Sequence, residues 1–439
     1  MPNLKTSKTE KGLFALIAFA IVYYALIQFQ ITTADGHPYD ASNYFIMATQ
    51  AAEGEPISDL KPFTYRIALP YLAGSLFPEN ITFGFRLINL FFAMFTLLIL
   101  YFYLGHFLKN RSTVLLLLFL YISSPISPFR FVHYIPSYVD PPALFFVLLL
   151  IYLSTRINQM TVKWCLVASA IGAVGSLFRE IAVCGALVLA FDQCAKLKLK
   201  PPFLSLAPVR TVILSIVPVV TTGLTIALIH NQIESLGTYE YSAQMLGVLE
   251  LLVDQPSIFF LSWLAAFGFL PLVIVLAFNR TVIAFLADNQ AVMVFLMGSV
   301  LLGISAGFHT DRIVFWAYPA ILLLFGLFLE NHPIVNATPR LKLLFFAPLA
   351  AGQILAMRMW LPIPDDPLGQ LANPGLPERI IFAPYGNTIL GQTYASTMLG
   401  SARIEMLSQF LLFSVYLGFV LFLSVKADSN PATHREQEV

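Results

Sequence analysis

One stretch decides the fold, and it reads LINLFFAMFTLLILYFYL over residues 87–104, without a single Asp, Glu, Lys or Arg. A helix that crosses about 30 Å of hydrocarbon needs roughly 20 predominantly apolar residues. Comparable runs recur along the whole chain. The first of them, residues 12–32, is too long for a signal-peptide core and lacks a convincing cleavage site, so we expect it to remain as an anchor.

The composition points the same way. Of 439 residues, 58% are hydrophobic and only 11% are charged, whereas soluble domains carry about a quarter charged residues. Lipid must therefore solvate most of these side chains. The formal charge of +1 gives no support to nucleic-acid binding, which leaves a basic footprint. Three cysteines, Cys165, Cys184 and Cys194, form neither a disulfide framework nor a metal-site spacing.

We expect an all-α, polytopic membrane protein with about 12 transmembrane helices, folded as one membrane-embedded domain over residues 1–439. The third and sixth spans are short and could be tilted, broken or re-entrant. The expected spans are residues 12–32, 83–107, 113–128, 141–156, 162–178, 181–195, 207–230, 257–278, 290–308, 312–329, 341–361 and 405–425.

The distribution of lysine and arginine predicts the orientation, because cytoplasmic loops carry the excess of both. Lys5, Lys8 and Lys11 precede the first span, which places the N-terminus in the cytoplasm. Alternation of the spans then brings the other basic loops and the C-terminus to the same side. Residues 33–82 form the first outer loop and residues 362–404 the last. Such compact loops favour a bacterial plasma membrane.

The first outer loop is the richest in chemistry. It opens with two carboxylates, Asp35 and Asp40, around a Gly-His-Pro-Tyr turn. Residues 41–52 have helical spacing of apolar side chains, so Asp40 could be the N-cap of a helix that lies along the membrane interface. The simpler interpretation of Asp35 is a solvated loop carboxylate. Either residue could instead act in catalysis.

Tyr65 and Arg66 follow later in the same loop, before an apolar stretch that ends at Phe77. An arginine at the headgroup level can reach out to lipid phosphate while its stem stays in the apolar layer. The planar fork of a guanidinium also suits the phosphate of a lipid-linked substrate.

More charged and polar side chains gather on the same predicted side. Arg179 and Glu180 separate two apolar runs, where a charge is costly unless it is paired or faces a cavity. Because adjacent residues cannot pair across a helix face, each needs a partner elsewhere. Structural ion pairing is one interpretation; their common location favours a substrate cavity. The charged and polar residues of this side are Arg130, His133, Asp140, Arg179, Glu180, His309, Asp311 and Arg312.

Two groups of motifs resemble the GT-C superfamily, integral-membrane glycosyltransferases that use polyprenyl-phosphate-linked sugars. The first outer loop supplies Asp40-x-x-x-Tyr44-x-x-x-Ala48, Gly54-Glu-Pro56 and Pro62-Phe-x-Tyr-Arg66-x-x-x-Pro70. The second group is Asp311-Arg312 followed by Phe315-Trp-Ala-Tyr-Pro319. The span count and the prominence of the first outer loop extend the resemblance over most of the chain.

The resemblance implies that an outer-loop carboxylate takes the proton of an acceptor hydroxyl while polyprenyl phosphate leaves with inversion. Carried over by position, Asp40 is the base and Asp35 the second candidate. Arg66 and Arg312 would bind the lipid phosphate. Substrate-binding candidates of lower rank, some of them beside those arginines, are Tyr65, Asp311, His309, Arg179, Glu180, His133 and Arg130.

The implied partners are a polyprenyl-phosphate sugar donor, a glycan, lipid or protein acceptor, and the bilayer. No second acidic residue adjoins Asp40, unlike the family's commonest form, so the choice of base and a need for a divalent metal stay open. A transporter or flippase of a lipid-linked or polar solute is the main alternative, although it predicts charges near the midplane and repeated broken helices. A non-catalytic scaffold is a third.

Overall fold

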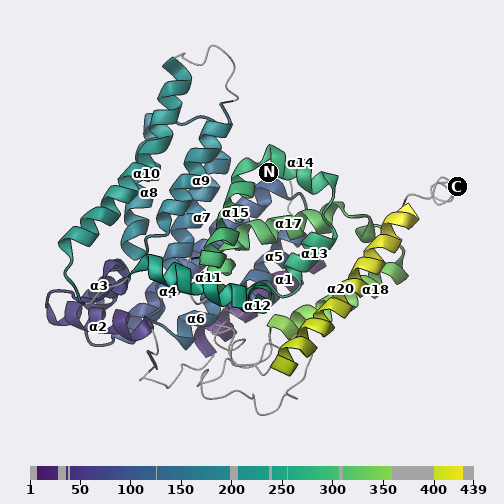
Figure 1. Cartoon of the computed structure of the whole chain (residues 1–439), viewed down its shortest axis with the longest axis horizontal. Coiled ribbons are helices and arrows are strands. Elements are labelled where there is room, and N and C mark those ends of the chain that lie inside the picture. Colours follow the sequence, from purple (N-terminus) through teal and green to yellow (C-terminus); the bar gives the residue numbers. More distant parts are fainter. Residues whose placement is uncertain are drawn as a thin grey trace.

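The structure, a computed structural model, describes residues 7–27, 36–37, 40–124, 126–197, 206–236, 240–254, 256–305, 310–357 and 400–428. These residues are almost entirely helical, as Figure 1 shows, and the all-α prediction is confirmed. One parallel pair of two-residue strands, β1 (Asp59–Leu60) and β2 (Ser235–Leu236), ties the first predicted loop to the segment after α10 (Leu206–Gln232).

The N-terminal half begins with a helix that continues into a π-helical turn, η1. Side chains cap several of the helices that follow; Asn80, for example, accepts a hydrogen bond from the Phe83 N–H at the start of α4. The elements are α1 (Lys8–Val22), η1 (Tyr23–Ile27), α2 (Asp40–Glu53), η3 (Phe63–Tyr65), α3 (Ala68–Leu76), α4 (Ile81–Phe107), α5 (Arg111–Ser123), α6 (Pro128–Tyr134), α7 (Asp140–Arg156), α8 (Val162–Phe178), α9 (Ala182–Ala195) and α10 (Leu206–Gln232).

The C-terminal half consists mostly of shorter helices, and it ends with the neighbouring and longer helices α18 (Pro339–Met357) and α20 (Gly400–Asp428), which form one edge of the molecule in Figure 1. Its elements are α11 (Tyr241–Asp254), α12 (Ser257–Phe267), α13 (Leu270–Leu276), α14 (Arg280–Asp288), α15 (Gln290–Ser305), α16 (Thr310–Val314), η4 (Phe315–Ala317), α17 (Tyr318–Asn331), η5 (Pro333–Val335), α18 (Pro339–Met357) and α20 (Gly400–Asp428).

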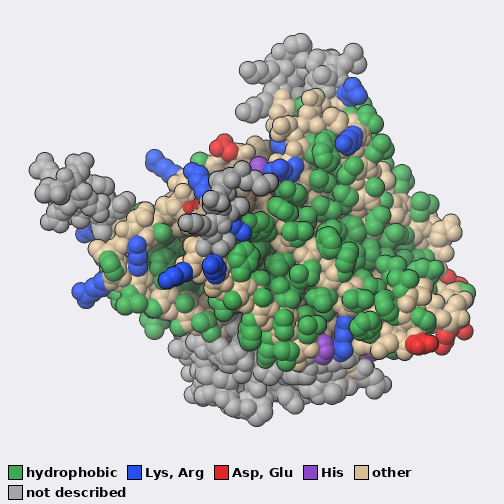
Figure 2. Space-filling model, turned by 180° about the vertical axis from the view of Figure 1, so that it is seen from behind, with side chains coloured by type: hydrophobic (Ala, Val, Ile, Leu, Met, Phe, Trp, Pro, Cys, Tyr) green, Lys and Arg blue, Asp and Glu red, His purple; other side chains and the backbone are tan. Residues whose placement is uncertain are grey.

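Several helices are apolar and long enough to lie in a lipid bilayer. Hydrophobic side chains cover a broad, continuous area of the face seen in Figure 2. Each of the twelve expected ranges contains a helix, but five of the described helices are long and apolar enough to cross a membrane, or six if the bent pair α13–α14 is one span. The five are Lys8–Ile27, Ile81–Phe107, Arg111–Tyr134, Val209–Gln232 and Arg312–Asn331.

Residues 257–278, expected as one span, do not form one continuous helix. The helix breaks at Gly268, which has a φ of +60°, and α13 and α14 then meet at an angle of 107°. Gln353 of α18 satisfies the broken backbone: its Oε1 accepts from the Phe269 N–H at 2.8 Å and its Nε2 donates to the Phe267 carbonyl at 3.0 Å. Such a break within apolar surroundings is stable only when its backbone groups find partners.

Some segments expected as loops also form helices, namely α6, α11 and α14. The helix expected over residues 41–52 is confirmed as α2, which begins at Asp40 and buries Tyr44, Met47 and Ala48. It packs closely on α3. A Cβ on Gly74 would lie 2.0 Å from the Ala48 carbonyl oxygen, so only glycine permits this approach.

We therefore expect Gly74→Ala to destabilise the protein by about 1–3 kcal/mol, the usual range for overpacking. Thermal unfolding in detergent measures the effect. Gly105→Ala in α4 is the matched control, because nothing lies within 4 Å of its added Cβ and alanine is the better helix former. An unfolding temperature of Gly74→Ala at or above that of the wild type would contradict the packing of α2 on α3.

Candidate functional site

Asp140 joins two arginines that lie far away in the sequence. It is the first residue of α7, where two prolines follow it in the opening turn. Its Oδ1 accepts a hydrogen bond from Arg179, and its Oδ2 accepts one from Arg312 Nη2 at 2.9 Å. Burial raises the pKa of Asp140, but the guanidinium groups of Arg179 and Arg312 outweigh burial and bring the pKa below its usual value. Asp140 therefore stays ionised and fully engaged.

A second pair fixes the first predicted loop. Arg66 Nε and Nη2 donate to the two oxygens of Glu180 at 3.0 and 2.6 Å, and Arg66 Nη1 donates to the Tyr44 hydroxyl at 2.7 Å. Arg66 and Tyr44 are buried. The bidentate geometry makes this one of the strong types of side-chain contact. Arg66 thereby ties α2 to the turn between α8 and α9.

Asp40 links α2 to Arg312. Its Oδ2 lies 3.7 Å from Arg312 Nη1, and its side chain is 27% exposed. Because Asp40 and Tyr44 are four residues apart in α2, they lie on the same face of that helix. These contacts form a closed set, because Arg312 also binds Asp140. We call this set the ring of charges; it comprises Asp40, Tyr44, Arg66, Glu180, Arg179, Asp140 and Arg312.

Three guanidinium groups and three carboxylates balance within the ring of charges. The contacts differ in strength. Breaking a buried, hydrogen-bonded pair such as Asp140–Arg312 costs about 3–5 kcal/mol, since a charge is left without its partner. The contact of Asp40 with Arg312 is longer, beyond hydrogen-bond distance, and its carboxylate is more exposed, so it contributes less than the Asp140 contact. Asp40 is the member of the ring that can move at the smallest cost.

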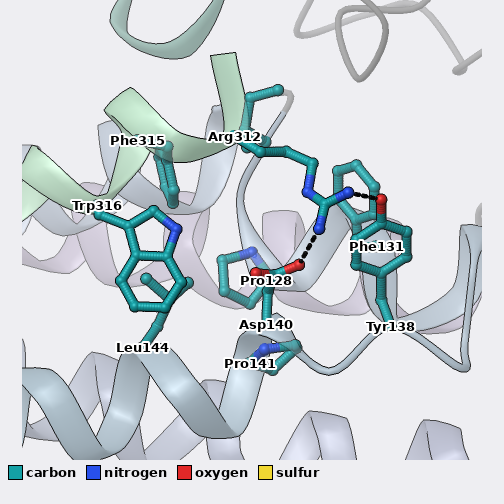
Figure 3. Close-up of a pocket in the computed structure, with 10 residues that line it drawn as sticks. Pro128, Phe131, Tyr138, Asp140, Pro141, Leu144, Arg312, Phe315 and Trp316 are labelled. Carbon is teal, nitrogen blue, oxygen red and sulfur yellow. Dashed lines mark hydrogen bonds and ion pairs between the residues drawn. The ribbon is translucent and has the colours of Figure 1, made fainter. Parts of the chain in front are cut away.

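A pocket adjoins the ring of charges at Arg312 (Figure 3). It is a small cavity of about 20 Å³ that opens partly to solvent. Arg312, Tyr138 and Asp140 form its polar side, and Trp316 lies across the pocket from Tyr138. The rest of the lining is apolar: Ile126, Pro128, Phe131, Pro141, Leu144 and Phe315. The Arg179 guanidinium lies 5.4 Å from the centre of the Trp316 ring.

The structure brings five of the sequence-predicted residues into the ring of charges: Asp40, Arg66, Arg179, Glu180 and Arg312. Tyr65 lies beside them, stacked on His230 at 3.7 Å between ring centres.

Other candidates are placed elsewhere or are not described. Arg130 is buried on α6 with its guanidinium 4.8 Å from the centre of the Tyr24 ring, and His133 is half-buried on the same helix. Asp35 and His309 lie outside the described residues, as does the side chain of Asp311.

Sequence reasoning did not assign Asp140, Tyr138 or Trp316 to the site. Asp140 carried a usable signal, since a carboxylate at the start of an apolar helix needs a partner. Tyr138 carried none, because its role depends on the hydrogen bond that its hydroxyl accepts from Arg312, 174 residues away in the sequence. Trp316 belongs to the motif Phe315-Trp-Ala-Tyr-Pro319, but a tryptophan among apolar residues is also typical of an ordinary apolar helix.

The site does not fit a divalent metal. The described residues include no group of three or more His, Cys, Asp or Glu side chains that could hold one. Asp40 and Asp140 are separated by Arg312, whose guanidinium contacts both carboxylates, so a cation between them would meet a positive charge.

Comparison with known proteins gave no match to any family model, curated protein or solved structure.

The Arg66–Glu180 pair predicts a specific dependence of stability on pH. Burial raises the pKa of Glu180, but Arg66 outweighs it and lowers the pKa from 4.5 to about 2. Because the folded pKa is the lower one, the pair stabilises the protein above pH 4.5, and this stability is lost as the pH falls towards 2. We expect the wild type to exceed Glu180→Gln in unfolding free energy at pH 7, with a gap that narrows below pH 4.5.

Thermal unfolding across this pH range measures the gap. Glu55→Gln is the matched control for the loss of a carboxylate, since Glu55 is exposed in the first predicted loop, which also contains Arg66. A gap between wild type and Glu180→Gln that stays constant from pH 7 to pH 3 would show that the pair does not set the dependence.

Proposed function

We propose that this protein is a membrane glycosyltransferase of the GT-C type, which moves a sugar from a polyprenyl-phosphate donor to an acceptor hydroxyl with inversion. One observation carries the proposal. The two segments that resemble the family, separated by most of the chain, meet at the 3.7 Å contact of Asp40 with Arg312, beside an apolar pocket. A carboxylate, a guanidinium and an apolar cavity are what the reaction of a lipid-linked donor requires.

Asp40 is the general base in this proposal. Its partial exposure and its long contact with Arg312 leave an oxygen able to take the proton of an acceptor hydroxyl. The acceptor oxygen then forms a bond to the anomeric carbon, the bond from that carbon to the phosphate oxygen breaks, and the phosphate keeps the electron pair. Asp140 is unsuited to the role because both of its oxygens accept hydrogen bonds from arginines.

Arg312 and Arg179 stabilise the departing phosphate. Both are largely buried, with 9% and 15% of their side chains exposed, and charge stabilisation is strongest where water is excluded. The resemblance also gave Arg66 this task, but its hydrogen bonds to Glu180 and Tyr44 favour a different one. Arg66 positions α2, and with it Asp40.

The apolar pocket beside Arg312 suits the prenyl part of the donor. Sugar hydroxyls buried against Ile126, Leu144 and Phe315 would lack partners, at a cost of roughly 2–7 kcal/mol each in an apolar environment. Isoprene units have no such requirement. The proposal therefore places the phosphate at Arg312, the start of the prenyl chain against the apolar side chains of the pocket, and the sugar on the side of Asp40.

The membrane arrangement belongs to the same proposal. Twelve spans would place both termini in the cytoplasm and Asp40, Arg66 and Arg312 outside, in the plasma membrane of a bacterium. The short apolar helices Val162–Phe178, Gln290–Ser305 and Phe410–Lys426 support additional spans. Helix ends assigned to the cytoplasm also meet one another: the Lys109 and Asn110 N–H groups donate to Glu330 at 3.1 and 2.7 Å.

We expect Asp40→Asn to lower sugar transfer by about 10²–10⁴-fold, the usual contribution of a positioned base. The assay offers a panel of polyprenyl-phosphate sugars, with acceptor extract, to the purified full-length protein in liposomes. Glu55→Gln removes an exposed carboxylate from the same loop and should leave the rate unchanged.

Transfer by Asp40→Asn at the wild-type rate would exclude Asp40 as the base and make Asp35 the next candidate. If the wild type consumes no donor but moves the lipid across the bilayer, the protein is a flippase and the proposal is wrong.

Orientation is tested with single cysteines. We expect Glu55→Cys, in intact cells, to react with a membrane-impermeant maleimide, and Lys109→Cys to react only after the cells are opened. Both positions are exposed at the surface, so the difference reports the side of the membrane. The wild type, with Cys165, Cys184 and Cys194, provides the background. Labelling of Lys109→Cys in intact cells would reverse the proposed topology.

A further inference from the structure

Arg312 contacts two carboxylates in different ways. Asp140 accepts a hydrogen bond from Nη2 at 2.9 Å and also binds Arg179, and only 17% of its side chain is exposed. Asp40 lies 3.7 Å from Nη1, beyond hydrogen-bond distance, with 27% of its side chain exposed. Of the two, Asp140 is the structural partner of Arg312 and Asp40 is the replaceable one.

The pocket lies next to this guanidinium, with Arg312, Tyr138 and Asp140 at its polar side (Figure 3). A phosphate with a prenyl chain in the pocket would have to approach Arg312. The ring of charges is already neutral, so an added anion at Arg312 would compete with the two carboxylates that Arg312 contacts, Asp140 and Asp40. Two anions at one guanidinium repel each other.

We infer that a prenyl phosphate binds Arg312 by taking the place of Asp40, while Asp140 holds Arg312 in position throughout. The inference deepens the proposed function and rests on it, because it takes the ligand of that site to be the phosphate of a prenyl donor. Asp140 is then a positioning residue, and the Arg312 face towards Asp40 is the phosphate subsite.

The exchange has a consequence for the reaction. While Asp40 contacts Arg312, its Oδ2 faces the guanidinium and is less available to a substrate hydroxyl. Once the phosphate replaces it, the carboxylate is released beside the sugar. Donor binding therefore prepares the base, and the donor binds productively before the acceptor.

Binding of farnesyl phosphate to the full-length protein in phosphatidylcholine nanodiscs tests the exchange. Asp40→Asn removes the competing carboxylate, and we expect its Kd to fall by about two- to fivefold, because the contact that the phosphate replaces is long and weak. Asp140→Asn removes the same charge but frees Arg312 from its support, and we expect its Kd to rise. Glu55→Gln is the control for net charge and should match the wild type. Inorganic phosphate, run in parallel, tests whether the headgroup suffices; we expect it to bind far more weakly.

The direction of change decides the outcome. Equal tightening in Asp40→Asn, Asp140→Asn and Glu55→Gln would reduce the effect to net charge and overturn the exchange, as would an unchanged or raised Kd in Asp40→Asn. If Asp140→Asn fails to fold, Asp140→Glu keeps the charge but displaces the carboxylate, and should also bind more weakly than the wild type. Tightening in Asp40→Asn without sugar transfer by the wild type would sink the proposed function and leave the phosphate subsite standing. Sugar transfer by the wild type without a lower Kd in Asp40→Asn would support the proposed function and overturn the exchange at Arg312.

Discussion

The position of Asp140 between Arg179 and Arg312 is the constraint on which the rest of the site depends. Each guanidinium is largely buried, and an unpaired buried charge carries an effective penalty of several kcal/mol. Three parts of the chain must therefore meet at one carboxylate: the start of α7, the turn between α8 and α9, and α16. That requirement brings the middle of the chain and its last third to the same end of the helices.

The second pair extends this constraint to α2. Glu180 is the sequence neighbour of Arg179, so the α8–α9 turn that binds Asp140 also binds Arg66 and, through it, Tyr44. Asp40 is placed by α2 on one side and touches Arg312 on the other. The two strong pairs give the ring of charges its shape, and the residue proposed to act on the substrate is the one held most loosely. Because Asp40 must leave Arg312 to react, its position is better set by the backbone of α2 than by a strong ion pair.

Features with a local cause were predictable from the sequence. Helix α2 follows from the spacing of apolar residues 41–52, and Arg179 and Glu180 needed distant partners because they interrupt apolar runs. The partners themselves were not predictable, since Arg66 and Glu180 are 114 residues apart and Asp140 and Arg312 are 172 apart. The break at Gly268 escaped for the same reason: the side chain that satisfies it, Gln353, comes from a helix 84 residues later.

Neutrality of the ring of charges bears on selectivity under the proposed function. Three unpaired arginines would attract any anion. Three paired arginines bind only a ligand whose own contacts compensate for the lost contact with the displaced carboxylate. A phosphate alone replaces one negative charge by another and gains little. A prenyl phosphate also buries hydrocarbon in the pocket beside Arg312, at about 0.8 kcal/mol for each CH₂ group. The apolar pocket then supplies the affinity and the exchange at Arg312 supplies the orientation, so soluble phosphates in the same compartment compete poorly for the site.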